Sequence, residues 1–360
     1  MATQSEGDKA NSQRGRSVAE HRSDGSSPAD AGRVLAKMQG VQVGYAIYAA
    51  VKLGIADTLG PGSMESEELA AKIGGHPRST FRLLRALVAL GLCAETNGRF
   101  SLTVEGSCLR TDAPNSVRNG VLRAGGMVAA GWSELCQSIR TGRTFYDLHG
   151  HGVSAFDWLA RNPNEGRIFF RASSEACHLQ AVHHVAAYDF TPFATIMDVG
   201  GGEGELLTTI LGAAPNSRGI LFEQPATLDG ARERLTRAGV IGRCRLVGGN
   251  FFDGIPEGAD LHVMRGVIHD WNDECALTIL RNSRRALRPN GRLLLVDRIM
   301  PERVQASAAH QGVTIADVSM LVSTGGCERT EAEFRTLLRQ AGFTLARAVP
   351  SAPLIDAVPI

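Results

Sequence analysis

The stretch TIMDVGGGEGELLTTI, residues 195–210, decides the fold class. An apolar run of strand length ends at Val199, a loop rich in glycine follows, and a helical pattern begins near Glu205. A strand, a tight loop and a helix in that order form the first half of a βαβ unit. In open sheets of such units, ligands bind at the carboxyl ends of the parallel strands. The stretch therefore predicts a fold class and the place of a binding site.

The same alternation of apolar runs and helical stretches continues downstream. The further runs are GILFE (219–223), RCRLVGG (243–249), DLHVMRGVI (260–268) and GRLLLVD (291–297). This alternation predicts an α/β domain over residues 191–360, with an open, mostly parallel, Rossmann-like sheet and right-handed connections.

The chain upstream, residues 30–190, has a different pattern and is predicted to be mainly helical. The segment from Tyr45 to Leu59 is apolar on nearly every side, so we expect it to be buried in a large core or against a second subunit. Two further helices and a hairpin about Asn97-Gly98 complete a winged-helix-like outline. This outline keeps a DNA-binding hypothesis open, with Arg78, Arg82 and Arg85 on its second helix, although a solvated helix face is the favoured interpretation.

Composition excludes several classes of protein. Hydrophobic residues make up 43% and charged residues 21% of the 360 residues, and the net charge is +1, which is typical of a soluble globular protein and favours neither nucleic acid nor membranes as partners. The seven cysteines are scattered without a C-x-x-C pair, so we expect free thiols and no metal site. No stretch resembles a membrane span or signal peptide, which predicts a cytoplasmic protein. Residues 1–29 are predicted to form a disordered tail.

The glycine loop indicates which ligand it holds. Counted from Gly200, the last glycine of a dinucleotide fingerprint would fall at Glu205, where a carboxylate would repel a pyrophosphate. The pattern is instead D-x-G-x-G-x-G, from Asp198 through Gly200 and Gly202 to Gly204. It favours a ligand with positive charge and hydroxyl or amine donors, such as S-adenosylmethionine, and it disfavours a nicotinamide oxidoreductase.

Polar and aromatic residues at the next strand ends fit the same ligand. Glu223 ends the second strand, where an acid can accept hydrogen bonds from ribose hydroxyls. Asn250 and Phe251 follow the third strand, and we expect them to bind the edge and the face of an adenine ring. Together these residues predict an adenosyl-cofactor site.

A histidine follows the fourth strand, in VIHDWNDECA (267–276). A neutral imidazole can take a proton from a hydroxyl near neutral pH, provided that a partner fixes its tautomer. Two acids are candidates for that partner of His269: Asp297 ends the next strand, and Glu328 precedes the last amphipathic helix. Asp270 is adjacent in sequence, and we expect it to point elsewhere.

The segment 115–190 is rich in residues suited to an apolar pocket, so we expect a flat aromatic substrate. The residues predicted to contact it are Met127, Trp132, Phe170, Asp270, Trp271, Met320 and Thr324.

From about Asp30 onward, the chain resembles the S-adenosylmethionine-dependent O-methyltransferases of the plant caffeate and bacterial polyketide type, including the carminomycin and mitomycin type. The motifs that carry the resemblance are LAAKIGGHPRSTFRLLRALVALGL, DVGGGEG, FEQP, GNFFDGIP, HDWNDECALTIL, LRPNGRLLLVD and DVSMLVSTGGCERTEAEFRTLLRQAGF. The resemblance implies a C-terminal class I methyltransferase domain and an N-terminal domain that forms an intertwined homodimer and covers the substrate, which moves the three arginines away from DNA.

The resemblance also assigns residues. It implies that His269 is the general base, flanked by Glu328 and Asp297. It places the cofactor contacts at Gly200, Glu223, Asn250, Phe251 and Arg265. The chain departs from the family pattern twice, because Asn250 stands where an aspartate is usual and Ser173, after Ala172, where a methionine is common.

The expected function is transfer of a methyl group from S-adenosylmethionine to a phenolic hydroxyl of an aromatic secondary metabolite. Two alternatives stay open: a relative that performs hydroxylation or decarboxylation on the same scaffold, and a winged-helix DNA-binding regulator.

Overall fold

The computed structural model describes residues 25–360. The disordered tail predicted for residues 1–29 therefore lies, up to residue 24, outside the described residues. The chain divides into two units, Met1–Val43 and Gly44–Ile360. Helix α1 (Pro28–Lys52) contributes to both units.

The second unit begins with a small helical region that contains a three-stranded antiparallel sheet. Its elements after α1 are α2 (Ile55–Leu59), β1 (Ser63–Glu65), α3 (Ser66–Ile73), α4 (Pro77–Ala89), β2 (Cys93–Thr96) and β3 (Arg99–Leu102). The sheet order is β1-β3-β2. Asn97 and Gly98, with φ of 50° and 78°, make the two-residue turn of the predicted hairpin. Leu69, Leu84 and Phe100 are fully buried in its core.

The segment predicted to be buried on every side is buried on one side only by the residues that the structure describes. Val51, Ile55 and Leu59 pack into the core of the small region, whereas half of the Tyr45 side chain is exposed. Further along α1, toward its N-terminus, four apolar residues are more than half exposed: Val34, Leu35, Met38 and Val41. Burial on the remaining sides would therefore need a surface outside residues 25–360.

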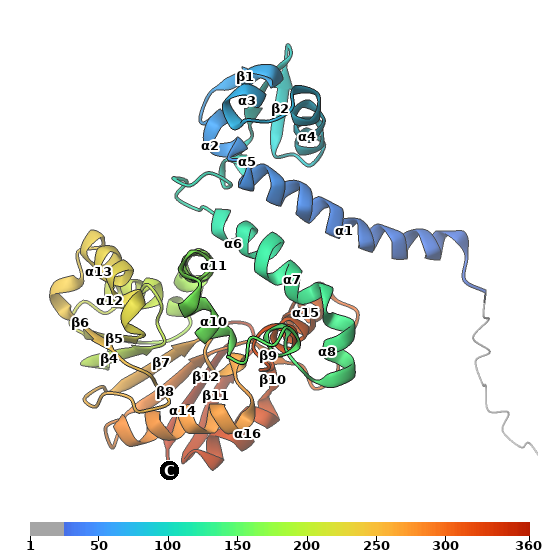
Figure 1. The fold of residues 1–360 in the computed structure, drawn as a ribbon. Helices are drawn as coiled ribbons and strands as arrows, with labels where there is room; N and C mark the ends of the chain where they lie inside the picture. Colours follow the sequence, from blue (N-terminus) through green and yellow to red (C-terminus); the bar gives the residue numbers. More distant parts are fainter. Residues whose placement is uncertain (1–24) are drawn as a thin grey trace, which may run out of the picture. The chain divides into compact units, whose positions relative to one another are not determined.

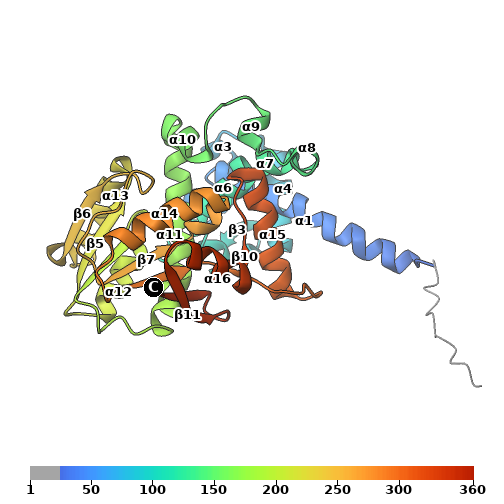
Figure 2. The ribbon, with the colours of Figure 1, turned by 90° about the horizontal axis from the view of Figure 1, so that it is seen from below.

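A series of helices leads from this region to the sheet. They are α5 (Val104–Ser107), α6 (Arg118–Arg123), α7 (Ala129–Ser133), α8 (Leu135–Thr141), α9 (Phe145–Leu148), α10 (Ala155–Arg161) and α11 (Pro163–Ala186), with a π-helical turn, η1 (Ala124–Val128), between α6 and α7. Helices α7, α8 and α9 contact α15 (Ala308–Ser323), as Figure 2 shows.

The remainder of the chain forms a seven-stranded sheet in the order β11-β12-β8-β7-β4-β5-β6 (Figure 1). Its strands are β4 (Thr195–Val199), β5 (Arg218–Glu223), β6 (Cys244–Gly248), β7 (Leu261–Arg265), β8 (Arg292–Val296), β11 (Phe343–Val349) and β12 (Leu354–Pro359). The pairs from β6 to β8 are parallel, and β12 is antiparallel to both of its neighbours. The prediction of an open, mostly parallel sheet is confirmed.

Helices cover both faces of this sheet (Figure 1). They are α11, α12 (Glu205–Ala213) and α13 (Leu228–Arg237) on one face, and α14 (Asp273–Ala286) and α16 (Glu331–Gln340) on the other. Successive residues of a strand point to opposite faces. Accordingly Ile196 packs with α11 and α12, whereas Met197 packs with α14 and α16. The apolar runs in the sequence are continuous because both faces of these strands are buried.

Short elements complete the edge of the sheet where the parallel strands end. They are η2 (Pro225–Thr227), η4 (Ile268–Asp270), β9 (Ile299–Met300) and β10 (Arg329–Thr330), whereas η3 (Ile241–Arg243) precedes β6 and lies at the opposite edge. Strands β9 and β10 pair in parallel, with Arg329 opposite Ile299. This pairing brings the segment that contains Glu328 next to the end of β8, although the two are far apart in sequence. None of the described helices is long and apolar enough to cross a membrane.

Candidate active site

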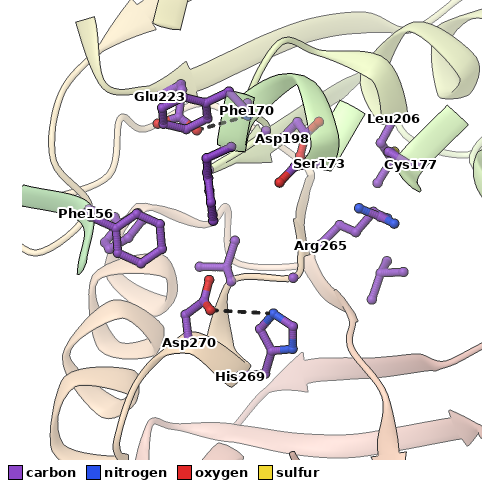
Figure 3. Close-up of a pocket in the computed structure, with 18 of the residues that line it drawn as sticks. Phe156, Phe170, Ser173, Cys177, Asp198, Leu206, Glu223, Arg265, His269 and Asp270 are labelled. Carbon is purple, nitrogen blue, oxygen red and sulfur yellow. Dashed lines mark hydrogen bonds and ion pairs between the residues drawn. The ribbon is translucent and has the colours of Figure 1, made fainter. Parts of the chain in front are cut away.

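A cavity of about 1530 Å³ lies at the carboxyl ends of β4, β5, β7 and β8. Loops after these strands line it, together with residues of α10, α11 and α15. Figure 3 shows Asp198 and Glu223 together on one side and His269 with Asp270 on the opposite side. Pockets for one small ligand usually measure about 300–1,000 Å³. The cavity is therefore large enough for two ligands.

The loop after β4 brings backbone directly to the cavity. Gly200 and Gly202 have φ of 70° and 57°, in the left-handed region that favours glycine. A Cβ on Gly200 would lie 2.9 Å from Cγ2 of Val267, and a Cβ on Gly201 would lie 2.5 Å from the Asp198 carboxyl carbon. Larger residues would therefore push the loop away from its present path. Gly200 is thus required by both conformation and space, and Gly202 by conformation alone.

Glu223 is held at the end of β5 by backbone donors. The amide of Gly202 donates to its Oε2 at 2.9 Å, and the amide of Gln224 donates to its Oε1 at 2.6 Å. Burial raises the pKa of Glu223, and these two amides oppose that effect. The carboxylate is thus fixed in direction, and each oxygen keeps a lone pair for hydroxyl donors of a ligand.

Asp198 is buried at the end of β4 and lines the cavity. Neither of its carboxylate oxygens has a hydrogen-bond partner among the described residues. Burial and the charge of Glu223 raise the pKa of Asp198 to about 7, while Arg265 and the Leu207 amide lower it less. An unsatisfied buried carboxylate is costly, so this group needs a partner from a ligand.

The loop after β6 supplies the other predicted cofactor residues. Asn250 and Phe251 line the cavity, and Oδ1 of Asn250 accepts from the Phe252 amide at 3.0 Å. The side-chain amide of the buried Asn282 donates to the carbonyls of Phe251, at 2.7 Å, and Phe252, at 3.0 Å, and so anchors this loop. Arg265, at the end of β7, also lines the cavity and donates to Oε1 of Gln180 at 3.4 Å.

These residues fit S-adenosylmethionine. Asp198 is a buried acceptor without a partner, and it suits the positive charge of an ammonium or sulfonium group. Glu223 suits a ribose diol, and Asn250 and Phe251 suit an adenine ring. Glu203 and Glu205 also line the cavity and share one arginine ion-pair partner, Arg234, so their net negative charge disfavours a pyrophosphate group.

The structure brings His269 together with three acids. Its Nδ1 donates to Oε1 of Glu328 at 3.1 Å, which leaves Nε2 as the proton acceptor of the neutral ring. The Glu328 carboxylate is fully shielded from solvent. The backbone amide of Glu328 donates a hydrogen bond to Oδ1 of Asp317 at 2.8 Å. Asp297 is also buried, lines the cavity and has no hydrogen-bond partner for either carboxylate oxygen among the described residues.

Asp270 also belongs to this cluster, contrary to the expectation that it points elsewhere. Its Oδ1 lies 3.8 Å from Nε2 of His269, and both residues line the cavity (Figure 3). Both residues belong to the 3₁₀ turn over residues 268–270, which lies at the cavity.

The acids govern the protonation of His269. Burial lowers the pKa of His269, but the charges of Asp270, Glu328 and Asp297 and the Glu328 hydrogen bond together raise it to about 9. Burial raises the pKa of Asp270 to about 6, against the charges of His269 and Arg123. Burial likewise raises the pKa of Asp297. The cluster therefore stabilises a protonated imidazole, which is the state that follows proton removal from a substrate.

Two residues that the sequence analysis did not single out hold the His269 turn in place. The buried Arg329 donates to the carbonyl of Ile268 at 3.1 Å, to the carbonyl of Trp271 at 2.8 Å and to Oδ1 of Asp273 at 2.8 Å. Gly326 packs directly on the turn, because a Cβ there would lie 2.0 Å from the His269 carbonyl oxygen. These contacts arise from tertiary structure and have no local sequence signal.

Aromatic side chains line the cavity beside the loop after β6, where Trp271 contacts Phe251 and Phe252. Phe156 stacks on Trp271, with ring centroids 5.4 Å apart and an interplanar angle of 27°. Phe170 and Met320, from the predicted substrate set, also line the cavity.

The other predicted substrate residues lie elsewhere. Met127 and Trp132 line a separate space of about 40 Å³, which shares Arg123, Ser319 and Met320 with the main cavity. Thr324 lines neither space. It caps the end of α15, where its Oγ1 accepts from the Gly326 amide at 3.4 Å.

Comparisons with known proteins agree with this geometry. Residues 132–344 match the O-methyltransferase domain family, and residues 36–112 match the O-methyltransferase dimerisation domain. The chain belongs to the O-methyltransferase family. The match at residues 36–112 assigns the segment with Arg78, Arg82 and Arg85 to a dimerisation domain and leaves the DNA-binding hypothesis without support.

Known relatives align with nearly the full length of this O-methyltransferase. A phenazine O-methyltransferase of Lysobacter antibioticus is 38% identical over 91% of this chain and 96% of that protein. The solved mitomycin 7-O-methyltransferase is 32% identical over 92% of this chain and 98% of that chain, with a TM-score of 0.82. An O-methyltransferase of neocarzinostatin biosynthesis, solved with S-adenosylmethionine and 2-hydroxy-5-methyl naphthoic acid, is 32% identical over 88% of this chain and 96% of that chain, with a TM-score of 0.74. The predicted cofactor is thereby confirmed.

Proposed function

We propose that this O-methyltransferase methylates a phenolic hydroxyl of an aromatic secondary metabolite, with His269 as the general base. The observation that carries the proposal is the placement of His269, with its Nδ1 fixed by Glu328, in the same cavity as the glycine loop and Glu223. One part of the cavity has the groups expected for an adenosyl cofactor. The opposite part has a base, and Phe156 and Trp271 line the same cavity.

The cofactor residues would be Asp198, Gly200, Gly202 and Glu223, with Asn250, Phe251 and Arg265 at the other strand ends. When bound, S-adenosylmethionine supplies a methyl group on a positively charged sulfur. The backbone of the glycine loop would contact this cofactor directly. The two oriented carboxylate oxygens of Glu223 would accept hydrogen bonds from its ribose hydroxyls.

His269 removes the proton of the acceptor hydroxyl through Nε2, which makes the oxygen a better nucleophile. Glu328 keeps the required tautomer, and the charges of Asp270 and Asp297 stabilise the imidazolium that forms. General-base catalysis of this kind contributes roughly 10²–10⁴-fold to rate. Phe156 and Trp271 would pack against the flat acceptor and exclude water from the reacting oxygen.

The names of relatives support an aromatic acceptor. In most of these names the methylated atom is oxygen, and in some it is nitrogen. One relative is named for a dihydroxy-methyl-naphthoate and another for an amino-hydroxybenzoate. A further relative is named a phenazine-1-carboxylate N-methyltransferase. The base at His269 favours oxygen, because a hydroxyl must lose a proton whereas an unprotonated ring nitrogen need not.

Calorimetric titration tests the cofactor assignment first. We expect micromolar binding of S-adenosylmethionine and no binding of NAD. A screen of phenolic acceptors with mass spectrometry of the products follows, since methylation adds one CH₂ whereas hydroxylation or decarboxylation changes the mass differently. Binding of NAD instead, or a product without an added methyl group, would overturn the proposal.

Replacing Glu223 by Gln should weaken binding of S-adenosylhomocysteine about 10- to 100-fold, because charge-assisted hydrogen bonds to ribose hydroxyls are lost. Calorimetry measures the change. Glu233→Gln is the matched control, because Glu233 lies on the exposed surface of α13 and should leave the affinity unchanged. Equal affinities in the two variants would remove Glu223 from the cofactor site.

The rate should depend strongly on pH. A base acts in its unprotonated form, and the pKa of His269 is raised to about 9. We therefore expect kcat/KM to rise about tenfold per pH unit up to roughly pH 9 and then to level off. Removing the Glu328 charge by Glu328→Gln lowers the pKa of His269 and should move the rising limb to lower pH. A profile that is flat below pH 9 would contradict the assignment.

We also propose that the protein is a homodimer through its N-terminal domain. The exposed apolar residues of α1 support this, because such faces are usually covered by a partner. Light scattering should give twice the mass of the chain, and Leu35→Asp together with Met38→Asp should give the single mass. A monomeric wild-type protein would contradict the proposal.

A further inference from the structure

Arg123 is a cation at the cavity that forms no ion pair with any residue that the structure describes. It is the last residue of α6, directly before the π-helical turn η1. Its Nε is shielded from solvent and lacks a hydrogen-bond partner, and Arg123 forms no ion pair or hydrogen bond with any residue from 25 to 360. Isolated π-helical turns occur frequently at functional sites.

The position of this arginine is fixed by close packing. The ring of Phe169 lies under its guanidinium, with 4.7 Å between the central carbon and the ring centroid. In the turn that follows, a Cβ on Gly125 would lie 2.2 Å from the Tyr48 ring, so the backbone of η1 is pressed against α1. The guanidinium is therefore held in a limited set of positions beside the cavity.

The charge and burial of Arg123 favour binding of an anion beside it. Burial lowers its pKa, and the charge of Asp270 opposes that effect without forming an ion pair with it. Arginine keeps its proton under such conditions, so the site holds a full positive charge. A partly buried charge without a partner is costly. A bound carboxylate would supply the missing partner.

The location of Arg123 indicates that the anion belongs to the methyl acceptor. Arg123 lines both the main cavity and the smaller space next to it, and Ser319 and Met320 do the same. It belongs to the region of Phe169, Asp270 and Met320, whereas the acidic groups Asp198 and Glu223 lie in the other part of the cavity. An aromatic acceptor beside Phe156 and Trp271, with its hydroxyl at His269, would extend toward Arg123.

We propose that Arg123 binds a carboxylate of the acceptor, so that the substrate class is hydroxylated aromatic acids. The proposal rests on the proposed function, since it concerns the acceptor of that reaction. The planar guanidinium can donate two parallel hydrogen bonds to a carboxylate. Arg123 is then the residue that selects acids over neutral aromatic compounds.

The test uses full-length protein saturated with S-adenosylhomocysteine, and calorimetry as the readout. The probes are hydroxybenzoic, hydroxynaphthoic and hydroxyphenazine-carboxylic acids, each paired with its carboxamide. For the wild type we expect at least one acid to bind about 10- to 100-fold more tightly than its carboxamide. This comparison needs no variant, so it stands even if substitutions of Arg123 impair folding.

Variants then test whether Arg123 causes the preference for the acid over the carboxamide. Arg123→Gln should abolish the preference for the acid, Arg123→Lys should retain part of it, and both should bind S-adenosylhomocysteine like the wild type. Arg140→Gln, at an exposed arginine of α8, should change nothing.

Three results would overturn the proposal. They are equal binding of acids and carboxamides, absence of binding by every acid, and loss of S-adenosylhomocysteine affinity in Arg123→Gln, which would assign the arginine to the cofactor. A wild-type protein that does not bind S-adenosylhomocysteine would overturn the proposed function instead, so the two failures are distinguishable.

Discussion

His269→Ala should lower kcat by about 10²–10⁴-fold while the affinity for S-adenosylmethionine stays within a few-fold of the wild type. The imidazole is the group in the cavity whose Nε2 is left as a proton acceptor by a fixed Nδ1 hydrogen bond. Asp198 and Glu223 lie in the other part of the cavity, and no hydrogen bond joins either of them to His269. Single-turnover kinetics and calorimetry measure the two quantities separately.

The control for this variant is His149→Ala. His149 lies on the exposed surface and does not line the cavity. Its Nε2 is 3.4 Å from Oε1 of Glu134. It should retain full activity. If His269→Ala also retained full turnover, the base would have to be another group, and Asp270 would be the next candidate because it lies 3.8 Å from the same nitrogen position.

Gly326→Ala should reduce kcat about 100-fold with little effect on cofactor affinity. The added Cβ would lie 2.0 Å from the His269 carbonyl oxygen and 2.4 Å from the Asp270 carbonyl carbon, and backbone cannot move aside as a flexible side chain can. The His269 turn must therefore shift relative to Glu328, and a misplacement of about 1 Å can cost on the order of 10²-fold in rate. Overpacking should also lower stability by roughly 1–3 kcal/mol.

Thermal unfolding separates these two effects, since assays well below the unfolding temperature still report the displaced base. Gly212→Ala is the matched control, because Gly212 is exposed in α12 and a Cβ there meets nothing within 4 Å. That substitution should raise stability slightly. Wild-type kinetics for Gly326→Ala would show that the turn adapts and that its packing does not position His269.

The sequence was sufficient for the features that repeat locally. The parallel strands were predicted because TIMDV, GILFE and their successors are continuous apolar runs, and the ligand edge followed from the glycines at 200, 202 and 204. The pairing of His269 with Glu328, 59 residues apart, was predicted only as one of two options, with Asp297 as the other. The structure places both acids near the imidazole and adds Asp270.

The rest of the site depends on contacts that sequence patterns do not carry. Arg123 sits in VLRAGGM, where nothing marks it as unpaired, and Arg329 is one of many arginines until its buried bonds to the His269 turn are seen. Met127 and Trp132 were predicted from composition alone, which cannot tell a main cavity from a small neighbouring space. Thr324 points to its own helix end instead of the cavity.

The antiparallel strand β12 has a consequence for how the protein is made. It lies between β8 and β11, and β11 pairs with no other strand of the sheet. During synthesis, β8 therefore has an open edge until the ribosome has released residues 354–359. The nascent domain spends that interval with an apolar strand exposed to other chains, and such edges promote aggregation. The earlier βαβ units therefore leave an unpaired edge, and pairing of β12 with β8 is the step that ends its exposure.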